Sequence, residues 1–141
     1  MFKIFILTIG VLSFLSASSE LNWNSSYEKA LKEAKAQNKD IYMLIVSSDC
    51  RWCRKFESTT LQDSEVIKRL EKKYILLEVN KDKDFIDPRF NTKSVPRHYF
   101  IREDEKIIHN FLGAWNRSDF YSFLKDVDKK RELILKTKEN R

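Results

Sequence analysis

The sequence predicts an α/β protein whose central mixed sheet has about four strands and is flanked by helices on both faces. The first observation is the unbroken apolar run at residues 41–46, which is typical of a strand buried on both faces. The second is the alternation of helical and strand patterns along the chain, which is typical of layered α/β folds. The third is the polar turn at residues 102–106, which joins two apolar strand patterns and predicts an antiparallel pair.

The first half of the chain contains two of the expected helices. An apolar stripe of helical period predicts a helix at about residues 25–37, with Asn24 or Ser25 as its N-cap. After the strand at residues 41–46, a second helical pattern begins at Cys50 and runs through Glu57.

The second half contains the remaining elements. Asp63 or Ser64 is expected to cap a further helix, which is followed by a strand at residues 74–79. A short helix is expected at residues 88–90, because proline is favoured at a first helical position. The antiparallel pair comes next, and Ser118 is expected to cap the last helix.

The N-terminal segment, residues 1–19, has the pattern of a secretory signal peptide. A short positive start is followed by a largely apolar run of 12 residues, 4–15, and then by small residues, 16–19. Cleavage is expected after Ser18 or Ser19. An uncleaved anchor is the alternative, although a membrane-spanning helix needs about 20 apolar residues.

The remaining chain is expected to form one domain at residues 20–128. A charged segment at residues 129–141 either extends the last helix or frays. Export predicts an extracytoplasmic location, the bacterial periplasm, with no membrane-embedded part once the signal is removed.

The two cysteines of the chain, Cys50 and Cys53, carry the predicted chemistry. Residues three apart on a helix are neighbours, so this pair can form and break a disulfide with little backbone movement. A cysteine at a helix N-terminus meets unpaired N–H groups and the positive end of the helix dipole, which favours the thiolate. Cys50 is therefore the expected nucleophile and Cys53 the resolving thiol. Arg51 further favours the thiolate, and Trp52 is expected to form an exposed rim that meets partner chains.

Other functions fit the sequence less well. The formal net charge is +6, but lysines alternate with acidic residues, which indicates a solvated surface rather than a nucleic-acid site. A purely structural disulfide is the alternative to redox work, yet a bridge across so few residues constrains little of the unfolded chain. A zinc site needs about four ligands, and only His98 and His109 are available beside the cysteines, so we expect neither a metal nor a cofactor.

Pro96 stands directly at the start of an apolar strand, where it cannot donate to a strand ladder. A cis Val95–Pro96 bond in a functional turn and an ordinary trans proline both explain this position.

Taken together, these motifs resemble the thioredoxin superfamily, and in particular exported thioredoxin-like proteins with a Cys-x-Trp-Cys motif. The resemblance covers about residues 23–127. Its motif residues are Trp23, Ala30, Leu31, Ala34, Lys35, Lys39, Ile41, Cys50, Trp52, Cys53, Val95, Pro96 and Gly113. The resemblance implies a cis proline at Pro96 beside the cysteine pair. It also implies that the backbone of Val95 receives an extended partner chain.

The chain departs from thioredoxin itself at two places. Thioredoxin has Gly-Pro between the cysteines, where this chain has Arg51 and Trp52, and it buries an acid at the position of Leu44. Proton transfer at Cys53 must then use another group, with Glu57 and Glu78 as candidates, or water. Asp49 lies next to Cys50 and opposes the thiolate, against Arg51 and the helix dipole.

The predicted function is an exported thiol:disulfide oxidoreductase that acts on cysteine-containing client proteins through Cys50 and Cys53. Trp52, Val95 and Pro96 are expected to hold the client chain. Reduction is the favoured direction, and the resemblance implies a membrane thiol-transfer protein as electron donor. The alternatives are a disulfide-forming oxidase and a non-catalytic binding or adaptor module.

Overall fold

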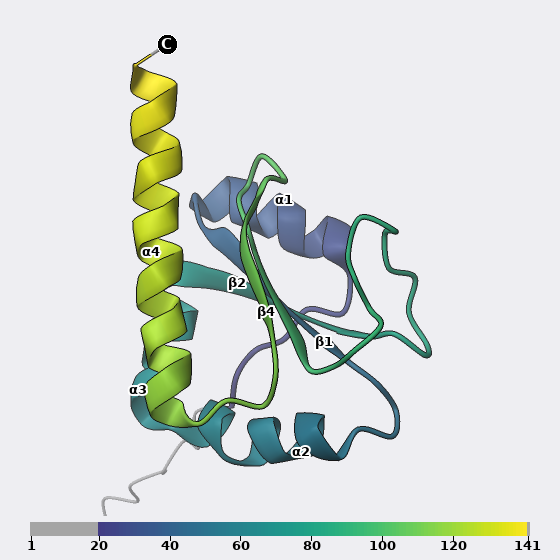
Figure 1. Ribbon diagram of the computed structural model, residues 1–141. Helices are drawn as coiled ribbons and strands as arrows, with labels where there is room; N and C mark the ends of the chain where they lie inside the picture. Colours follow the sequence, from purple (N-terminus) through teal and green to yellow (C-terminus); the bar gives the residue numbers. More distant parts are fainter. Residues whose placement is uncertain (1–19, 141) are drawn as a thin grey trace, which may run out of the picture.

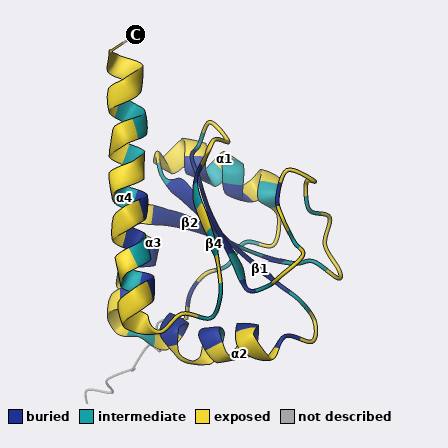
Figure 2. Ribbon diagram, in the orientation of Figure 1, coloured by how far each residue is buried: buried dark blue, intermediate teal, exposed yellow. Residues whose placement is uncertain are grey.

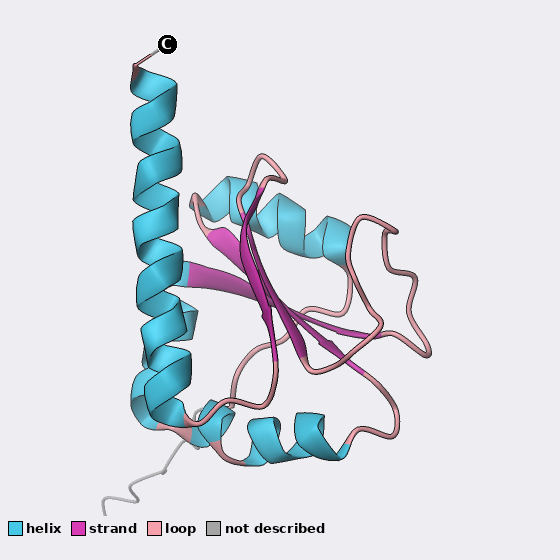
Figure 3. Cartoon of the chain, in the orientation of Figure 1, coloured by secondary structure: helices cyan, strands magenta, loops and turns pink. Residues whose placement is uncertain are grey.

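The computed structural model describes residues 20–140, and the predicted signal segment, residues 1–19, lies outside the described residues (Figure 1). One strand separates the first helix from the next helices, three strands then follow one another, and a long helix comes last (Figure 3). The elements are α1 (Tyr27–Gln37), β1 (Asp40–Val46), α2 (Arg51–Ser58), the 3-10 turn η1 (Thr60–Gln62), α3 (Ser64–Lys73), β2 (Tyr74–Asn80), β3 (Arg97–Ile101), β4 (Ile107–Leu112) and α4 (Arg117–Glu139).

The four strands form one mixed sheet in the order β2-β1-β3-β4. The β1–β2 pair is parallel, and the β1–β3 and β3–β4 pairs are antiparallel. All seven residues of β1 are buried, as expected for a central strand covered on both faces. The predicted fold class, a mixed four-stranded sheet between helices, is confirmed.

Each face of the sheet has its own apolar core. Helix α1 covers one face through Ala30 and Ala34. Helices α2, α3 and α4 cover the other face, and their core residues include both cysteines (Figure 1). The cysteine pair therefore belongs to the core beneath three helices rather than to a separate loop.

Local capping differs from the sequence prediction at two helices. Ser26, rather than Asn24 or Ser25, caps α1, and its hydroxyl accepts from the Lys29 N–H at 3.3 Å. Asn116, rather than Ser118, caps α4, and its side-chain oxygen accepts from the Asp119 N–H at 3.0 Å. Several neighbouring residues at each site have a suitable side chain, so the path of the chain decides which of them is used.

The short helix expected at residues 88–90 is wrong, because this segment is an isolated turn. The Asp87 carboxylate accepts from the Arg89 N–H, and the Asp87 carbonyl accepts from the Phe90 N–H at 3.0 Å. These bonds close one turn of chain, and the helix does not propagate beyond it.

Helix α4 continues through the charged C-terminal segment to Glu139. Its second half is largely exposed and extends past the sheet (Figure 2). Two ion pairs hold it to the domain, from Arg131 to the buried Asp40 and from Lys138 to Asp104. Within residues 20–140, no helix has both the length and the apolar character needed to cross a bilayer.

Candidate functional site

Cys50 and Cys53 are joined by a disulfide at the start of α2, with their Cα atoms 5.2 Å apart. Cys50 is the N-cap of the helix, and its Sγ accepts from the Cys53 N–H at 3.1 Å. Both are buried in this oxidised form, and Cys50 is the more exposed, with 7% of its surface accessible against 2% for Cys53. An N–H directed at Cys50 Sγ stabilises negative charge on this sulfur once the disulfide is opened.

The residues between and around the cysteines form a charged, partly aromatic rim. Trp52 is 55% exposed, and the Arg51 guanidinium and the Lys55 ammonium lie 5.9 and 5.2 Å from the centre of its ring. The fully exposed carboxylate of Asp49 pairs with Arg54 at 3.7 Å. Asp49 therefore faces solvent, where water and Arg54 screen its effect on Cys50.

The prolyl segment, residues 95–97, lies at the same core. The Val95–Pro96 peptide bond is cis, Pro96 is buried, and Val95 packs against the core cluster that contains both cysteines. The Pro96 carbonyl accepts from the Gly113 N–H at 2.9 Å. The fold thus brings Val95 to the core that contains Cys50 and Cys53, although Val95 is far from both in the sequence.

Gly113 occupies a backbone conformation that requires glycine. Its φ is +127°, and an added Cβ would lie 3.0 Å from the Trp115 Nε1 atom. Both the dihedral angle and the close approach exclude a larger residue without rearrangement. As the only glycine after residue 19, Gly113 was expected at a positive φ or at a close approach, and this prediction is confirmed.

Leu44, at the position of thioredoxin's buried acid, is fully buried in β1. Glu78 pairs with it in register on β2, and Glu57 and Glu78 line a hollow of about 240 Å³ together with Trp23. Burial raises the pKa of Glu57, and burial and the Glu57 charge raise the pKa of Glu78. The two proposed proton acceptors are therefore neighbours, on the cysteine side of the sheet.

His98 is a functional candidate that was not predicted from the sequence, where it was considered only as a metal ligand. It is fully buried, and its ring lies 2.9 Å from both the Tyr42 hydroxyl and the Gly113 carbonyl oxygen. Burial lowers the pKa of His98 to about 4. The available signal was a polar residue in an apolar strand, two positions after Pro96. Among residues 20–140, no group of three histidine, cysteine or acidic side chains is placed to hold a metal ion.

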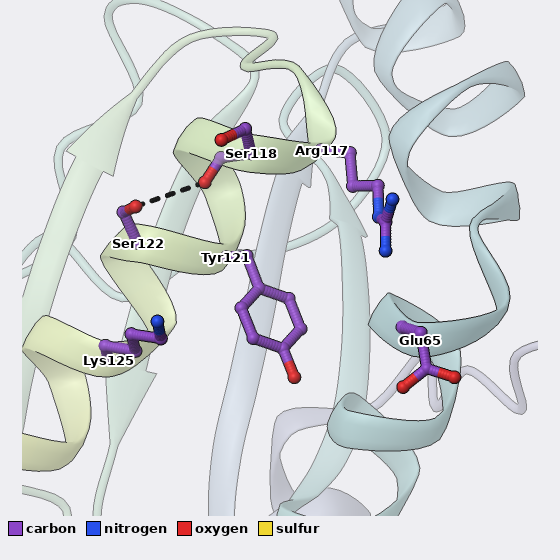
Figure 4. Close-up of a pocket in the computed structure, with 6 residues that line it drawn as sticks. All are labelled: Glu65, Arg117, Ser118, Tyr121, Ser122 and Lys125. Atoms are coloured by element: carbon purple, nitrogen blue, oxygen red, sulfur yellow. Dashed lines mark hydrogen bonds between the residues drawn. The ribbon is translucent and has the colours of Figure 1, made fainter.

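A separate hollow of about 420 Å³ lies between α3 and the start of α4 (Figure 4). Its lining is polar, and Ser122 donates to the Ser118 carbonyl at 3.2 Å. Arg117, on its wall, is paired with Asp63 at 2.9 Å. No cysteine lines this hollow, so it is distinct from the disulfide site.

Comparisons with known proteins agree with this geometry. A family model described as "Thioredoxin-like domain" matches residues 27–128. An uncharacterized protein of Borreliella burgdorferi is 25% identical over 141 residues, which cover 95% of this chain and 61% of that protein. Mouse spermatogenesis-associated protein 20 is 27% identical over 66 residues, and there the match spans 8% of the relative's length.

Two solved structures show the same fold. A thioredoxin from Thermus thermophilus superposes with a TM-score of 0.68 at 22% identity, covering 76% of this chain and 86% of that one. A structure described as "DsbH Oxidoreductase" superposes with a TM-score of 0.64 at 21% identity, covering 92% of this chain and 95% of that one.

Proposed function

The chain belongs to the thioredoxin-like domain family, and from this premise we propose that it is an exported thiol:disulfide oxidoreductase acting on client proteins. The main support is the Cys50–Cys53 disulfide at the start of α2, where Cys50 Sγ accepts a hydrogen bond from the Cys53 N–H at 3.1 Å. This geometry supports reversible exchange, because the sulfur that meets the helix N-terminus is the one best stabilised as a thiolate.

In the reducing direction the reaction has two steps. The Cys50 thiolate attacks one sulfur of a client disulfide, a mixed disulfide forms, and the other client sulfur leaves as a thiolate that takes a proton from solvent. The Cys53 thiolate then attacks Cys50 Sγ, which breaks the mixed disulfide and releases the second client thiol. Two electrons pass to the client, and the protein is left with the Cys50–Cys53 disulfide.

We favour reduction as the direction, with a membrane thiol-transfer protein in the extracytoplasmic space restoring the dithiol. The likeness to a protein described as DsbH Oxidoreductase supports an exchange partner of this kind. Trp52 is the exposed aromatic beside the cysteines, and with Val95 and Pro96 it is proposed to receive the client chain. A reduction potential of roughly −200 to −270 mV fits a reductase, whereas about −120 mV fits an oxidase.

Trapping of the mixed disulfide tests the proposal. The Cys53→Ser protein is expected to accumulate disulfide-linked clients, because the resolving step is lost. The Cys50→Ser protein, with the nucleophile removed, is the matched control and should trap none. Insulin reduction by the wild-type protein separates turnover from mere binding. Absence of both trapping and insulin reduction would favour the adaptor alternative.

Export is tested separately from chemistry. The full-length protein is expected to lose residues 1–18 or 1–19 on expression in a bacterium and to be recovered from the periplasmic fraction. Mass spectrometry of the intact protein measures the new N-terminus. Recovery of the uncut chain from membranes would instead indicate an anchor.

A further inference from the structure

His98 sits in an environment that tolerates a polar ring only if both nitrogens are bonded. The side chain is fully buried, and three phenylalanines surround it. The ring centres of Phe111, Phe56 and Phe120 lie 4.5, 4.9 and 5.7 Å from that of His98. Burying an unpaired polar group costs several kcal/mol in such surroundings, so the two hydrogen bonds of His98 offset the cost of burying its ring nitrogens.

The chemistry of the two partners fixes the state of the ring. The Gly113 carbonyl only accepts, so Nε2 of His98 must carry the proton in the 2.9 Å contact. Burial lowers the pKa of His98, so the ring is neutral at neutral pH and Nδ1 has a free lone pair. The Tyr42 hydroxyl, 2.9 Å away, therefore donates to Nδ1.

The bond to Gly113 closes a ring of interactions around the prolyl segment. The Gly113 N–H donates to the Pro96 carbonyl at 2.9 Å, and the Gly113 carbonyl accepts from His98. The two peptide groups of Gly113, at the end of β4, are thus tied to both ends of the stretch from Pro96 to His98. Phe56, one helical turn after Cys53, packs edge-on against the His98 ring.

We propose that His98 is a positioning residue that holds the prolyl segment against the Gly113 turn, in the conformation that receives the client chain. This inference rests on the proposed exchange function. His98 touches neither cysteine in this role, and it acts through Gly113 and Pro96. Its loss is therefore expected to weaken client binding and to leave the intrinsic reactivity of Cys50 unchanged.

The kinetic test compares a protein disulfide with a small one. The His98→Phe protein is expected to raise the KM for insulin about tenfold, the cost of one buried hydrogen bond. Its kcat, and its rate with the small disulfide dithiobis(nitrobenzoate), should stay within about threefold of the wild type. The His98→Gln protein keeps a donor near Nε2 and is expected to restore KM. His109→Phe, the same change at the partly exposed histidine of β4, is the matched control and should alter neither rate.

A second readout does not depend on exchange activity. Amide hydrogen exchange by NMR on the oxidised protein should be about tenfold faster at Gly113 in His98→Phe than in His109→Phe. The amide of Leu44, in the central strand, reports global unfolding. Its exchange rate should increase less than that of Gly113. If His98→Phe does not fold, His98→Leu is measured in the same way.

Two results would overturn the inference. One is equal loss of activity toward insulin and the small disulfide, which indicates general damage. The other is unchanged protection of the Gly113 amide in the His98 variants. If the wild-type protein reduces no disulfide at all while Gly113 still loses protection, the proposed function fails and the positioning of the prolyl segment stands.

Discussion

Lowering the pH should destabilise the folded protein through His98, and the size of the effect follows from its burial. Burial lowers the pKa of His98 from 6.5 to about 4. The unfolded chain therefore takes up a proton as the pH falls through 6.5, whereas the folded protein takes it up only near 4. At 1.36 kcal/mol per pKa unit, the stabilisation lost over this window is at most roughly 3.4 kcal/mol, and roughly 2 kcal/mol is gone by pH 5.

Urea unfolding of the wild type and of His98→Phe, at several pH values between 7 and 5, measures the contribution of His98 to the free energy of unfolding. Other groups titrate in the same range, and the raised pKa values of Glu57 and Glu78, caused by burial, act in the opposite direction. These carboxyls are present in both proteins, so the difference between the two curves isolates His98.

The surroundings of His98 contain few other groups that could change this difference between the two proteins. The polar or charged groups that act on it are the Tyr42 hydroxyl, the Gly113 carbonyl and the Arg97 charge, and the phenylalanines around it do not titrate. The free energy of unfolding of the wild type should fall relative to the variant as the pH drops. A difference that stays constant from pH 7 to pH 5 would refute a neutral, buried His98.

Three further predictions concern stability. Gly113→Ala should cost about 1–3 kcal/mol in thermal or urea unfolding, because alanine is strained at a φ of +127°; an unchanged midpoint would contradict this. Arg131→Ala should cost about 3 kcal/mol, because it leaves the Asp40 carboxylate, which is 4% exposed, without its partner. Combining it with Asp40→Asn should recover part of that loss, and strict additivity would argue against the pair. Glu78→Gln should raise the free energy of unfolding at pH 7, because burial and Glu57 raise the pKa of Glu78 and disfavour its charged form. The gain should shrink as the pH falls below the ordinary glutamate pKa of 4.5, because Glu78 then becomes protonated in the unfolded chain as well, and a gain that persists well below that pH would have another cause.

Features encoded within a few neighbouring residues could be predicted from the sequence. The buried strand β1 followed from its apolar run, and the start of α2 at Cys50 followed from the change of period at the cysteine motif. The fold class followed from the order of such elements. Each of these signals depends on local spacing, which the linear sequence displays directly.

Features set by long-range contacts were not predictable. Asp40 lies just before the predicted strand at residues 41–46, but it is the buried first residue of β1 and pairs with Arg131, 91 residues later. The role of His98 depends on the register between β3 and β4, which brings Gly113 to its ring. Neither contact is marked by a pattern of neighbouring residues, so the sequence shows only a single acidic residue and a single histidine at these positions.

The absence of a buried acid at Leu44 has a structural consequence for proton transfer. Leu44 pairs in register with Glu78 on one side and His98 on the other. Both nitrogens of His98 are engaged, and a ring whose pKa is about 4 cannot take a proton from a thiol at neutral pH. His98, the β3 neighbour of Leu44, therefore does not accept the proton of Cys53. Glu57 and Glu78 lie on the β2 side of Leu44, where they line a hollow together with Trp23. Of the two in-register neighbours of Leu44 in the described chain, Glu78 is the one that carries a carboxyl, and Glu57 lies at the same hollow. The β2 side of Leu44 is therefore where a replacement for the missing carboxylate is expected.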